Sequence, residues 1–373
     1  MNSRRLFLKK IGVLIAFSLV GCNRSANLTS STTSTGNWFM PDESAVHKRT
    51  WMSFRASEEI WGRKLAPGAQ DNLATIARTI ARYEPVVMLV EDEDYDTAQE
   101  KCGPSVELLK TSIDDLWMRD TGAVFVQNQG GALGAVDFNF NGWGDKQEHE
   151  NDAKIAGFIA RYAQAELLNT QLALEGGGIE VDGRGTAIIT ESCTLNPNRN
   201  PDVSKQDCEA ELNKLLGLRK IIWLPGTRGQ DITDGHTDFY ARFVRPGMVA
   251  AHLENDPQFY DYEVTRTHLE MLRSATDAEG RKLEVVVLEG PQSIRPEYAS
   301  NDFAAGYINF YVANGVVVAP EFGDIEADSK AKETLERLFP KRDIVQINID
   351  AIAAGGGGIH CTTQQEPVAI YDL

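Results

Sequence analysis

A cysteine near the C-terminus, Cys361, follows four consecutive glycines at positions 355–358 and the dipeptide Ile359-His360. Glycine has no side chain and adopts unusual φ values, so glycine-rich turns let backbone approach a ligand closely. A thiol at the end of such a turn is typical of a site where a cysteine attacks a small substrate as a thiolate. A buried structural cysteine is the alternative for this residue taken alone. We expect residues 359–363 to continue as an extended strand.

Three upstream clusters carry side chains that could assist a nucleophilic thiol. They are Trp117-Met118-Arg119-Asp120, Glu175 followed by three glycines, and His236-Thr237-Asp238. In an extended segment, His236 and Asp238 would share one face, about 7 Å apart. Each cluster also has a structural interpretation: Asp120 as the partner of Arg119, Glu175 as a turn acid, His236 as a satisfied buried histidine. A cysteine, a histidine and three acids together favour a nucleophile–base–orienter site.

Alternating strands and helices are expected to position these clusters. Short runs rich in β-branched residues predict buried strands at 86–90, 187–190, 220–224, 285–288 and 315–319. Helices are expected at 70–83, 152–165, 204–216, 262–275 and 329–338. One such unit recurs roughly every 60–70 residues, which favours a repeated α/β module over one doubly wound sheet. The lack of a linker after residue 37 favours one domain.

The composition is that of a large soluble body with an acidic surface. Of 373 residues, 42% are hydrophobic and 24% charged, and the net charge is −17. The segment before Cys22 holds four basic residues and no acids, so its removal changes the net charge from −17 to −21. Such a surface repels nucleic acid and anionic lipid and mildly favours cationic ligands. The five cysteines show no Cys-x-x-Cys spacing, which argues against a zinc or iron–sulfur site. The sequence does not decide whether Cys193 and Cys208 form a disulfide.

The N-terminus carries export features. Ser3 to Lys10 reads as a twin-arginine signal, and residues 11–20 form an apolar stretch too short to cross a bilayer as a helix. Leu19-Val20-Gly21-Cys22 matches a lipobox, in which Cys22 is acylated. We therefore predict a signal peptide at 1–21, a flexible tether at 22–37 and a catalytic domain at 38–373. The expected location is the periplasmic side, as an anchored lipoprotein; a plain cleaved leader is the alternative.

The sequence resembles the agmatine deiminase and bacterial peptidylarginine deiminase family of guanidino-modifying enzymes. The matching segments follow the family order from about residue 38 to the C-terminus. They are Trp117-x-Arg119-Asp120-Thr121-Gly122, 137–144, Glu175-Gly176-Gly177, 190–201, Asp234-Gly235-His236-x-Asp238, 309–315, Pro320-x-Phe322-Gly323-Asp324 and Gly356-Gly357-x-Ile359-His360-Cys361-x-Thr363-Gln364-Gln365. The resemblance implies the pentein fold: an α/β propeller of five ββαβ-type units around a pseudo-fivefold axis, with a central active site.

The resemblance also implies roles for the candidate residues. Asp120 and Asp238 would hold the planar guanidinium from different edges. Cys361 would attack its central carbon as a thiolate, assisted by the charge of the substrate. His236 would protonate the departing ammonia and then activate water against the thiouronium intermediate, and Glu175 would orient His236. Hydrolysis of agmatine would give N-carbamoylputrescine and ammonia, with no metal or organic cofactor.

Two substrate contacts and two departures from the family pattern remain. Trp117 and Gly357 are expected to line the substrate site, the indole facing the methylene chain of the substrate. The residue before Ile359, usually Asn in agmatine deiminases, is Gly358, and the common proline after Gly122 is Ala123. Both border the site, and export is unusual for an agmatine deiminase, so peptidylarginine is the alternative substrate.

Two further classes of protein compete with this interpretation. A metallohydrolase could use His236, Asp238 and Asp120 as ligands, but it leaves Cys361 without a role. A lipid-anchored protein that binds polyamines would want acids and Trp117, but it does not need the histidine and the cysteine. The sequence leaves a homo-oligomer open.

Overall fold

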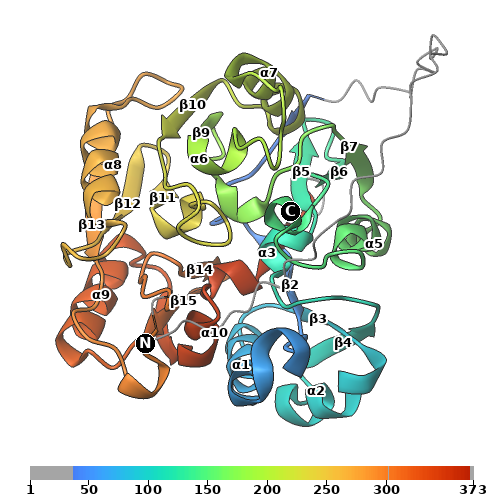
Figure 1. The fold of residues 1–373 in the computed structure, drawn as a ribbon. Helices are drawn as coiled ribbons and strands as arrows, with labels where there is room; N and C mark the ends of the chain where they lie inside the picture. The colour runs from blue at the N-terminus through green and yellow to red at the C-terminus, as the bar shows by residue number, and fades with distance from the viewer. Residues whose placement is uncertain (1–36, 301, 370–373) are drawn as a thin grey trace, which may run out of the picture. The chain divides into compact units, whose positions relative to one another are not determined.

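The strands of the described residues form five small separate sheets (Figure 1). The computed structural model describes residues 37–300 and 302–369, which belong to one compact unit. The predicted signal peptide, the lipidation site Cys22 and nearly all of the predicted tether lie outside the described residues. Within them, no helix has the length and apolar character that a membrane crossing requires.

Apart from two pairings, each sheet is built from strands that follow one another in the chain. In spatial order, the first sheet contains β1 (Trp38–Phe39), β5 (Val124–Asn128), β6 (Leu133–Asp137) and β7 (Glu166–Asn169), and the second contains β10 (Lys220–Leu224), β9 (Thr186–Thr190) and β8 (Ile179–Val181). The third contains β11 (Ala241–Arg245), β12 (Met248–Leu253) and β13 (Glu284–Glu289), and the fourth contains β14 (Tyr311–Ala313), β15 (Val316–Glu321) and β16 (Asp343–Asn348). The fifth contains β17 (Gln364–Pro367), β2 (His47–Ser53), β3 (Val86–Val90) and β4 (Val106–Lys110). The two exceptions are the pairings of β1 with β5 and of β17 with β2. The C-terminal strand β17 pairs with β2, so the last sheet joins the two ends of the described chain.

The sheets share one pattern, an antiparallel pair followed by a helical crossover to a parallel strand. The pairs β5–β6, β8–β9, β11–β12, β14–β15 and β17–β2 are antiparallel, and β7, β10, β13, β16 and β3 add parallel. The crossovers contain α5 (Ile155–Ala163), α7 (Lys205–Leu216), α8 (Tyr262–Ser274), α9 (Ile325–Leu338) and α1 (Glu58–Ile80). Parallel neighbours require such long connections. The predicted repeated α/β module is therefore confirmed.

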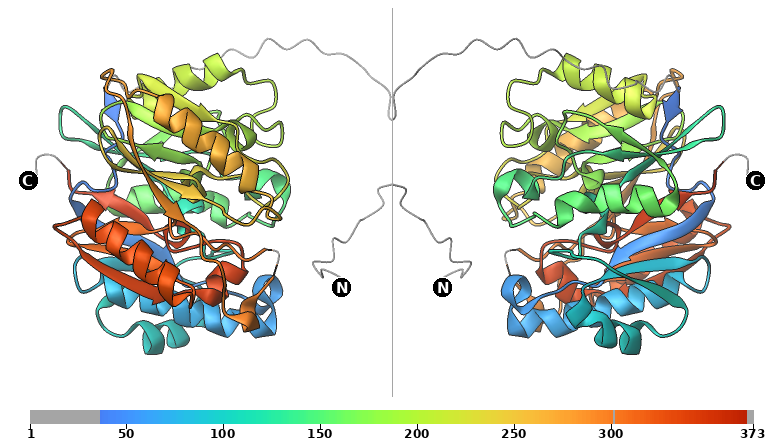
Figure 2. Two further views of the ribbon diagram at one scale, coloured as in Figure 1. Left: turned by 90° about the vertical axis from the view of Figure 1, so that its left-hand side faces the viewer. Right: turned by 90° about the vertical axis from the view of Figure 1, so that its right-hand side faces the viewer.

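The crossover helices cover the outer sides of their sheets (Figures 1 and 2). Helix α7 begins at a capping box between Ser204 and Asp207 and ends at Gly217, which adopts φ +68. Its buried leucines, Leu212 and Leu215, pack against Ile189 and other apolar residues of the β8–β9–β10 sheet. An amphipathic face of this kind supplies most of the stability of a helix of ordinary length.

The five buried strands and the five helices predicted for the repeated units all exist, and the main difference in bounds is at α1. This helix begins at Glu58 rather than at residue 70. Gly62 breaks the helical dihedrals with φ +69, and Pro67 follows within the helix, so the sequence of the first turns lacks a regular helical pattern. The short helix α2 (Tyr95–Cys102) then connects β3 to β4.

Two predicted extended segments are wrong. His236 to Asp238 enter a 3-10 turn, Thr237–Phe239, because Asp234 and Gly235 reverse the chain with φ +63 and +87. Residues 360–362 likewise form a 3-10 turn, and the strand begins only at Gln364. Both segments therefore present their side chains from turns and not from strand faces.

Candidate active site

The predicted site residues occupy equivalent places, at or just before short helical turns that lead into the first strand of a sheet. Asp120 lies in α3 (Met118–Thr121) before β5, and Glu175 precedes the turn Gly176–Gly178 before β8. His236 and Asp238 lie at the turn before β11, and Cys361 lies in the turn His360–Thr362 before β17. The repeated module therefore brings segments that are far apart in sequence to one place.

Three of these side chains converge on Gly177. An added Cβ at Gly177 would lie 2.6 Å from His236 Nδ1, 2.9 Å from Asp120 Oδ1 and 3.2 Å from Asp238 Oδ2. No side chain fits at this position without displacing polar atoms of buried residues. Glycine at 177 therefore lets the backbone lie directly against the histidine and the two acids.

Cys361 is 7% exposed and lies beside Asp238. Its Sγ donates to Asp238 Oδ2 at 3.7 Å, and Asn309 Nδ2 donates to Sγ at 3.3 Å. The backbone N–H of His360 donates to Asn309 Oδ1 at 2.9 Å, which fixes the turn. Burial, and then the carboxylates of Asp238 and Asp120, raise the pKa of Cys361 well above the usual value of a thiol. These surroundings therefore favour the thiol form of Cys361 over the thiolate.

Asp238 has one partnered and one unpartnered oxygen. Oδ2 accepts from His360 Nδ1 at 2.7 Å. Oδ1 is buried and has no hydrogen-bond partner among the residues that the structure describes. Burial favours the neutral acid, but the hydrogen bond and the charge of His360 outweigh it and lower the pKa of Asp238. A buried, ionised oxygen without a partner is costly, and native structures retain few such groups.

Asp120 is fixed by two donors. Trp143 Nε1 donates to Oδ2 at 3.0 Å, and the N–H of Gly177 donates to Oδ1 at 3.1 Å. Burial, together with the charges of other carboxylates nearby, raises the pKa of Asp120 despite the opposing charge of His236. The interpretation of Asp120 as the partner of Arg119 is wrong, since the guanidinium of Arg119 binds other side chains instead: Glu43, Gln364 and Gln365.

His236 lies between two carboxylates. Its Nε2 lies 3.2 Å from Glu175 Oε2, and its Nδ1 lies 3.7 Å from Asp120 Oδ1. Burial alone would lower the pKa of His236, but the charge of Asp120 and the hydrogen bonds from its neighbours raise it well above its usual value. The imidazolium form is therefore favoured, which suits a group that donates a proton first.

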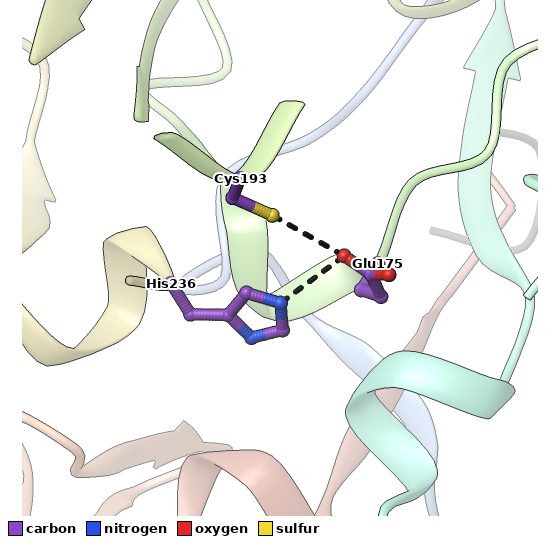
Figure 3. Close-up of side chains that lie close together, drawn as sticks. All are labelled: Glu175, Cys193 and His236. Carbon is purple, nitrogen blue, oxygen red and sulfur yellow. Dashed lines mark hydrogen bonds and ion pairs between the residues drawn. The ribbon is translucent and has the colours of Figure 1, made fainter. Parts of the chain in front are cut away.

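Both oxygens of Glu175 accept hydrogen bonds, and Figure 3 shows the two contacts of Oε2, with Cys193 and His236. Arg199 Nε donates to Oε1 at 2.9 Å, while Cys193 Sγ donates to Oε2 at 3.3 Å beside His236. Burial raises the pKa of Glu175, but His236 and Arg199 outweigh it and hold the pKa at about 2. The carboxylate stays ionised and fixes the orientation of the imidazole ring.

Trp117 and Gly357 contact each other. An added Cβ at Gly357 would lie 2.1 Å from Trp117 Cζ3, so the glycine turn passes directly over the indole ring. The ring centroid lies 5.7 Å from that of Trp61, and Asp115 accepts from both indole N–H groups at 2.7 and 3.0 Å. Trp117 belongs to the same buried apolar cluster as Cys361.

Comparison with known proteins identifies the family. Residues 39–367 match the family described as Porphyromonas-type peptidyl-arginine deiminase. The chain belongs to this family. A Streptomyces coelicolor protein assigned to the agmatine deiminases is 43% identical over 342 residues, covering 88% of this chain and 98% of that protein. The agmatine deiminase of Stutzerimonas stutzeri is 38% identical over 364 residues, covering 91% and 98%. The structure of the Enterococcus faecalis agmatine deiminase aligns with a TM-score of 0.85 at 31% identity, covering 90% and 97%.

Several residues that contact the site were missed as functional candidates in this deiminase-family sequence. Trp143, Cys193, Arg199, Asn309 and His360 lie in segments that match the family, and those segments were the signal that could have found them. Each touches one of the acids, the histidine or the nucleophile.

Glu43 had no such signal, since it is a single acid in a loop near the N-terminal end of the deiminase domain. Its carboxylate nevertheless binds Arg119 at 3.2 Å, Arg242 at 2.7 Å and His360 Nε2 at 2.7 Å. His360 in turn binds Asp238. Glu43 therefore supports the acid that lies next to the nucleophile.

The three residues suggested as ligands of a metallohydrolase, His236, Asp238 and Asp120, are not the residues that the structure groups as possible metal ligands. Within residues 37–300 and 302–369, the group whose donor atoms all lie within 4.8 Å of one another is Glu175, Cys193 and His236, and not His236 with Asp238 and Asp120. Cys193 and Cys208 do not form a disulfide, since both are free and buried. Cys193 faces Glu175, whereas Cys208 packs in the apolar cluster under α7.

Proposed function

We propose that the protein hydrolyses agmatine to N-carbamoylputrescine and ammonia through a covalent intermediate on Cys361. The observation that carries the proposal is the convergence of His236, Asp120 and Asp238 around Gly177, with the thiol of Cys361 against Asp238. This arrangement combines a nucleophile, a proton donor and two carboxylates. A guanidinium needs each of them. Hydrolysis of the C–N bond of a linear amidine is the activity of the agmatine deiminases to which the chain is similar.

The guanidinium would bind between the two acids. It is planar and presents a fork of N–H donors that carboxylates accept with defined geometry. Asp238 Oδ1 is the natural first acceptor, because it is buried and has no other partner in the described structure. Asp120 would accept from a second edge while it keeps its bonds to Trp143 and Gly177.

Binding of the cation would generate the nucleophile. A positive charge beside Cys361 reverses the effect of the two carboxylates on its pKa, so the thiol loses its proton to solvent as the substrate enters. The thiolate then adds to the electron-poor central carbon. The amide of Asn309, 3.3 Å from Sγ, would hold the sulfur in position.

His236 would carry the protons in both halves of the reaction. As an imidazolium it protonates the departing nitrogen, ammonia leaves, and an S-alkylthiouronium remains on Cys361. The neutral ring then takes a proton from water, which attacks the same carbon, and the C–S bond breaks to return the thiolate. Glu175 orients the ring throughout and favours its charged form.

A substrate panel tests the proposal and its main alternative. Trp117 and Gly357 would line the methylene chain of the substrate, and the net charge of −21 after removal of residues 1–21 favours a free cationic amine. Free agmatine should exceed an internal peptidylarginine by at least roughly 10²-fold in kcat/KM, which requires only about 2.7 kcal/mol of differential transition-state binding. Arginine is the third substrate of the panel. A preference for the peptide would identify the protein as a peptidylarginine deiminase instead. Absence of turnover with all three would refute deimination.

The finer architecture is part of the proposal. We infer that the five ββαβ-type units surround a pseudo-fivefold axis as in a pentein propeller. The shared strand pattern of the sheets and the pairing of β17 with β2 support this arrangement. The site residues would then lie at the centre, since they precede the first strands of four of the five sheets.

We also propose that residues 1–21 are a twin-arginine signal, that residues 22–37 are a tether, and that acylated Cys22 anchors the enzyme on the periplasmic side. The support is the sequence of these residues. Cell fractionation tests it: Cys22→Ala should move the catalytic domain, residues 38–373, from the membrane to the soluble fraction. Retention of the variant in the membrane would remove the anchor from the account.

A further inference from the structure

The side chains of Glu175, Cys193 and His236 point toward one another (Figure 3). Glu175 Oε2 lies 3.2 Å from His236 Nε2 and 3.3 Å from Cys193 Sγ, and all three donor atoms lie within 4.8 Å of one another. In a tetrahedral zinc site, metal–ligand bonds of about 2.0–2.3 Å separate the ligand atoms by roughly 3.3–3.8 Å. The two separations from Glu175 Oε2 therefore nearly match those of zinc ligands, and the sulfur of Cys193 lies no more than 4.8 Å from the nitrogen of His236.

We propose that Glu175, Cys193 and His236 form an inhibitory site for Zn²⁺. Thiolate, imidazole and carboxylate together are a donor set that zinc prefers over magnesium or calcium. The inhibitory effect rests on the proposed function of His236, whereas binding of the metal does not.

Exchange of protons for the metal is balanced at this site. Two hydrogen bonds converge on Glu175 Oε2, one from the thiol of Cys193 and one from the ring of His236. A zinc ion would take the place of these two protons, which leave to solvent as the thiolate and the imidazole nitrogen bind the metal. A divalent cation replaces two single charges, so the net charge of this buried site stays the same.

The surroundings hold the donors as the outer shell of a metal site does. The second ring nitrogen of His236 faces the carboxylate of Asp120 at 3.7 Å, and Arg199 holds the other oxygen of Glu175 at 2.9 Å. The side next to Gly178 carries no side chain: a Cβ there would lie at ordinary contact distances, 3.6 Å from Cys193 Sγ and 3.9 Å from His236 Cδ2. A water molecule in that space would complete the coordination.

Bound zinc would stop proton transfer. With Nε2 on the metal, the ring of His236 cannot hold the second proton of the imidazolium, so it cannot deliver a proton to the departing ammonia. The nucleophile Cys361 is not a ligand in this arrangement. Zinc therefore inhibits without binding the nucleophile, and a chelator restores turnover.

Cobalt absorption tests the site without turnover. In the Cys361→Ser background, Co²⁺ should produce a thiolate-to-cobalt charge-transfer band. The band should disappear in Cys361→Ser/Cys193→Ser and persist in Cys361→Ser/Cys208→Ser, the matched control for a second buried thiol. A band that survives loss of Cys193, or the absence of a band in Cys361→Ser, overturns the metal site. Either result does so even if the wild-type protein turns agmatine over normally.

Zinc titration of ammonia release tests the inhibitory effect. Inhibition should weaken at least about 10-fold in Cys193→Ser and stay unchanged in Cys208→Ser. Equal inhibition of Cys193→Ser and wild type contradicts the proposal. If Cys193→Ser does not fold, anomalous scattering from zinc-soaked wild-type crystals decides: an ion bonded to the sulfur of Cys193 supports the site, and an ion only elsewhere overturns it.

Discussion

Replacement of Asp238 by Asn should abolish most activity while it leaves the fold intact. The change removes the charge next to Cys361 and alters the buried oxygen that has no partner in the described structure. A carboxylate and a guanidinium at about 4 Å attract by about 4 kcal/mol at an effective dielectric constant near 20. That energy corresponds to about 10³-fold in kcat/KM. Ammonia release from agmatine, measured across substrate concentrations, should show this loss.

The stability of Asp238→Asn should stay close to wild type because two effects oppose each other. The bond from His360 Nδ1, at 2.7 Å, becomes a neutral hydrogen bond and weakens by about 1 kcal/mol. Removal of an unpartnered charge from the interior offsets this loss. Asp182→Asn is the matched control, since Asp182 is buried and also has an unpartnered oxygen but lies at the β8–β9 turn. Near-normal turnover of Asp238→Asn, or an equal loss in the control, would refute a guanidinium-binding role.

Three further substitutions test the other parts of the site. Asp120→Asn should lower turnover about 10²–10³-fold. The alkaline limb of the pH profile of kcat should also move to lower pH, because loss of the carboxylate lowers the pKa of His236. An unmoved limb would contradict the pairing of Asp120 with His236. Glu175→Gln should lose turnover and also about 1.5–3 kcal/mol of unfolding free energy, since Arg199 loses one of its two buried carboxylate partners and keeps Asp234. Unchanged denaturant unfolding would contradict this. Gly177→Ala should lose most turnover because its Cβ would displace His236, Asp120 and Asp238, whereas the helical Gly157→Ala should keep normal turnover. An active Gly177→Ala would show that turnover does not depend on this packing.

The sequence predicted the elements and the participants better than the local geometry. Buried strands such as 220–224 were predicted with their bounds, because short β-branched runs between turn formers have few other structures available. The turn at His236 was interpreted as an extended segment, because nothing local shows that Asp234 takes a left-handed conformation. That conformation depends on tertiary contacts, among them the pairing of Asp234 with Arg199.

The supporting contacts of the site could not be predicted for a related reason. Glu43 reaches Arg119, Arg242 and His360 only after distant modules have come together. Periodicity and motifs report on neighbours in sequence, whereas this cluster joins residues more than 300 positions apart. The contacts of Glu43 with these residues can be found only from coordinates.

The most direct test of the account is detection of the covalent intermediate on Cys361. Wild-type protein mixed with agmatine and quenched in acid should carry a mass increment on the peptide that contains Cys361. Cys361→Ser should give neither ammonia nor an adduct. Its thermal unfolding and its cobalt charge-transfer band should show that the variant is folded. An increment on Cys193 or Cys208 instead, or turnover by Cys361→Ser, would contradict the central claim.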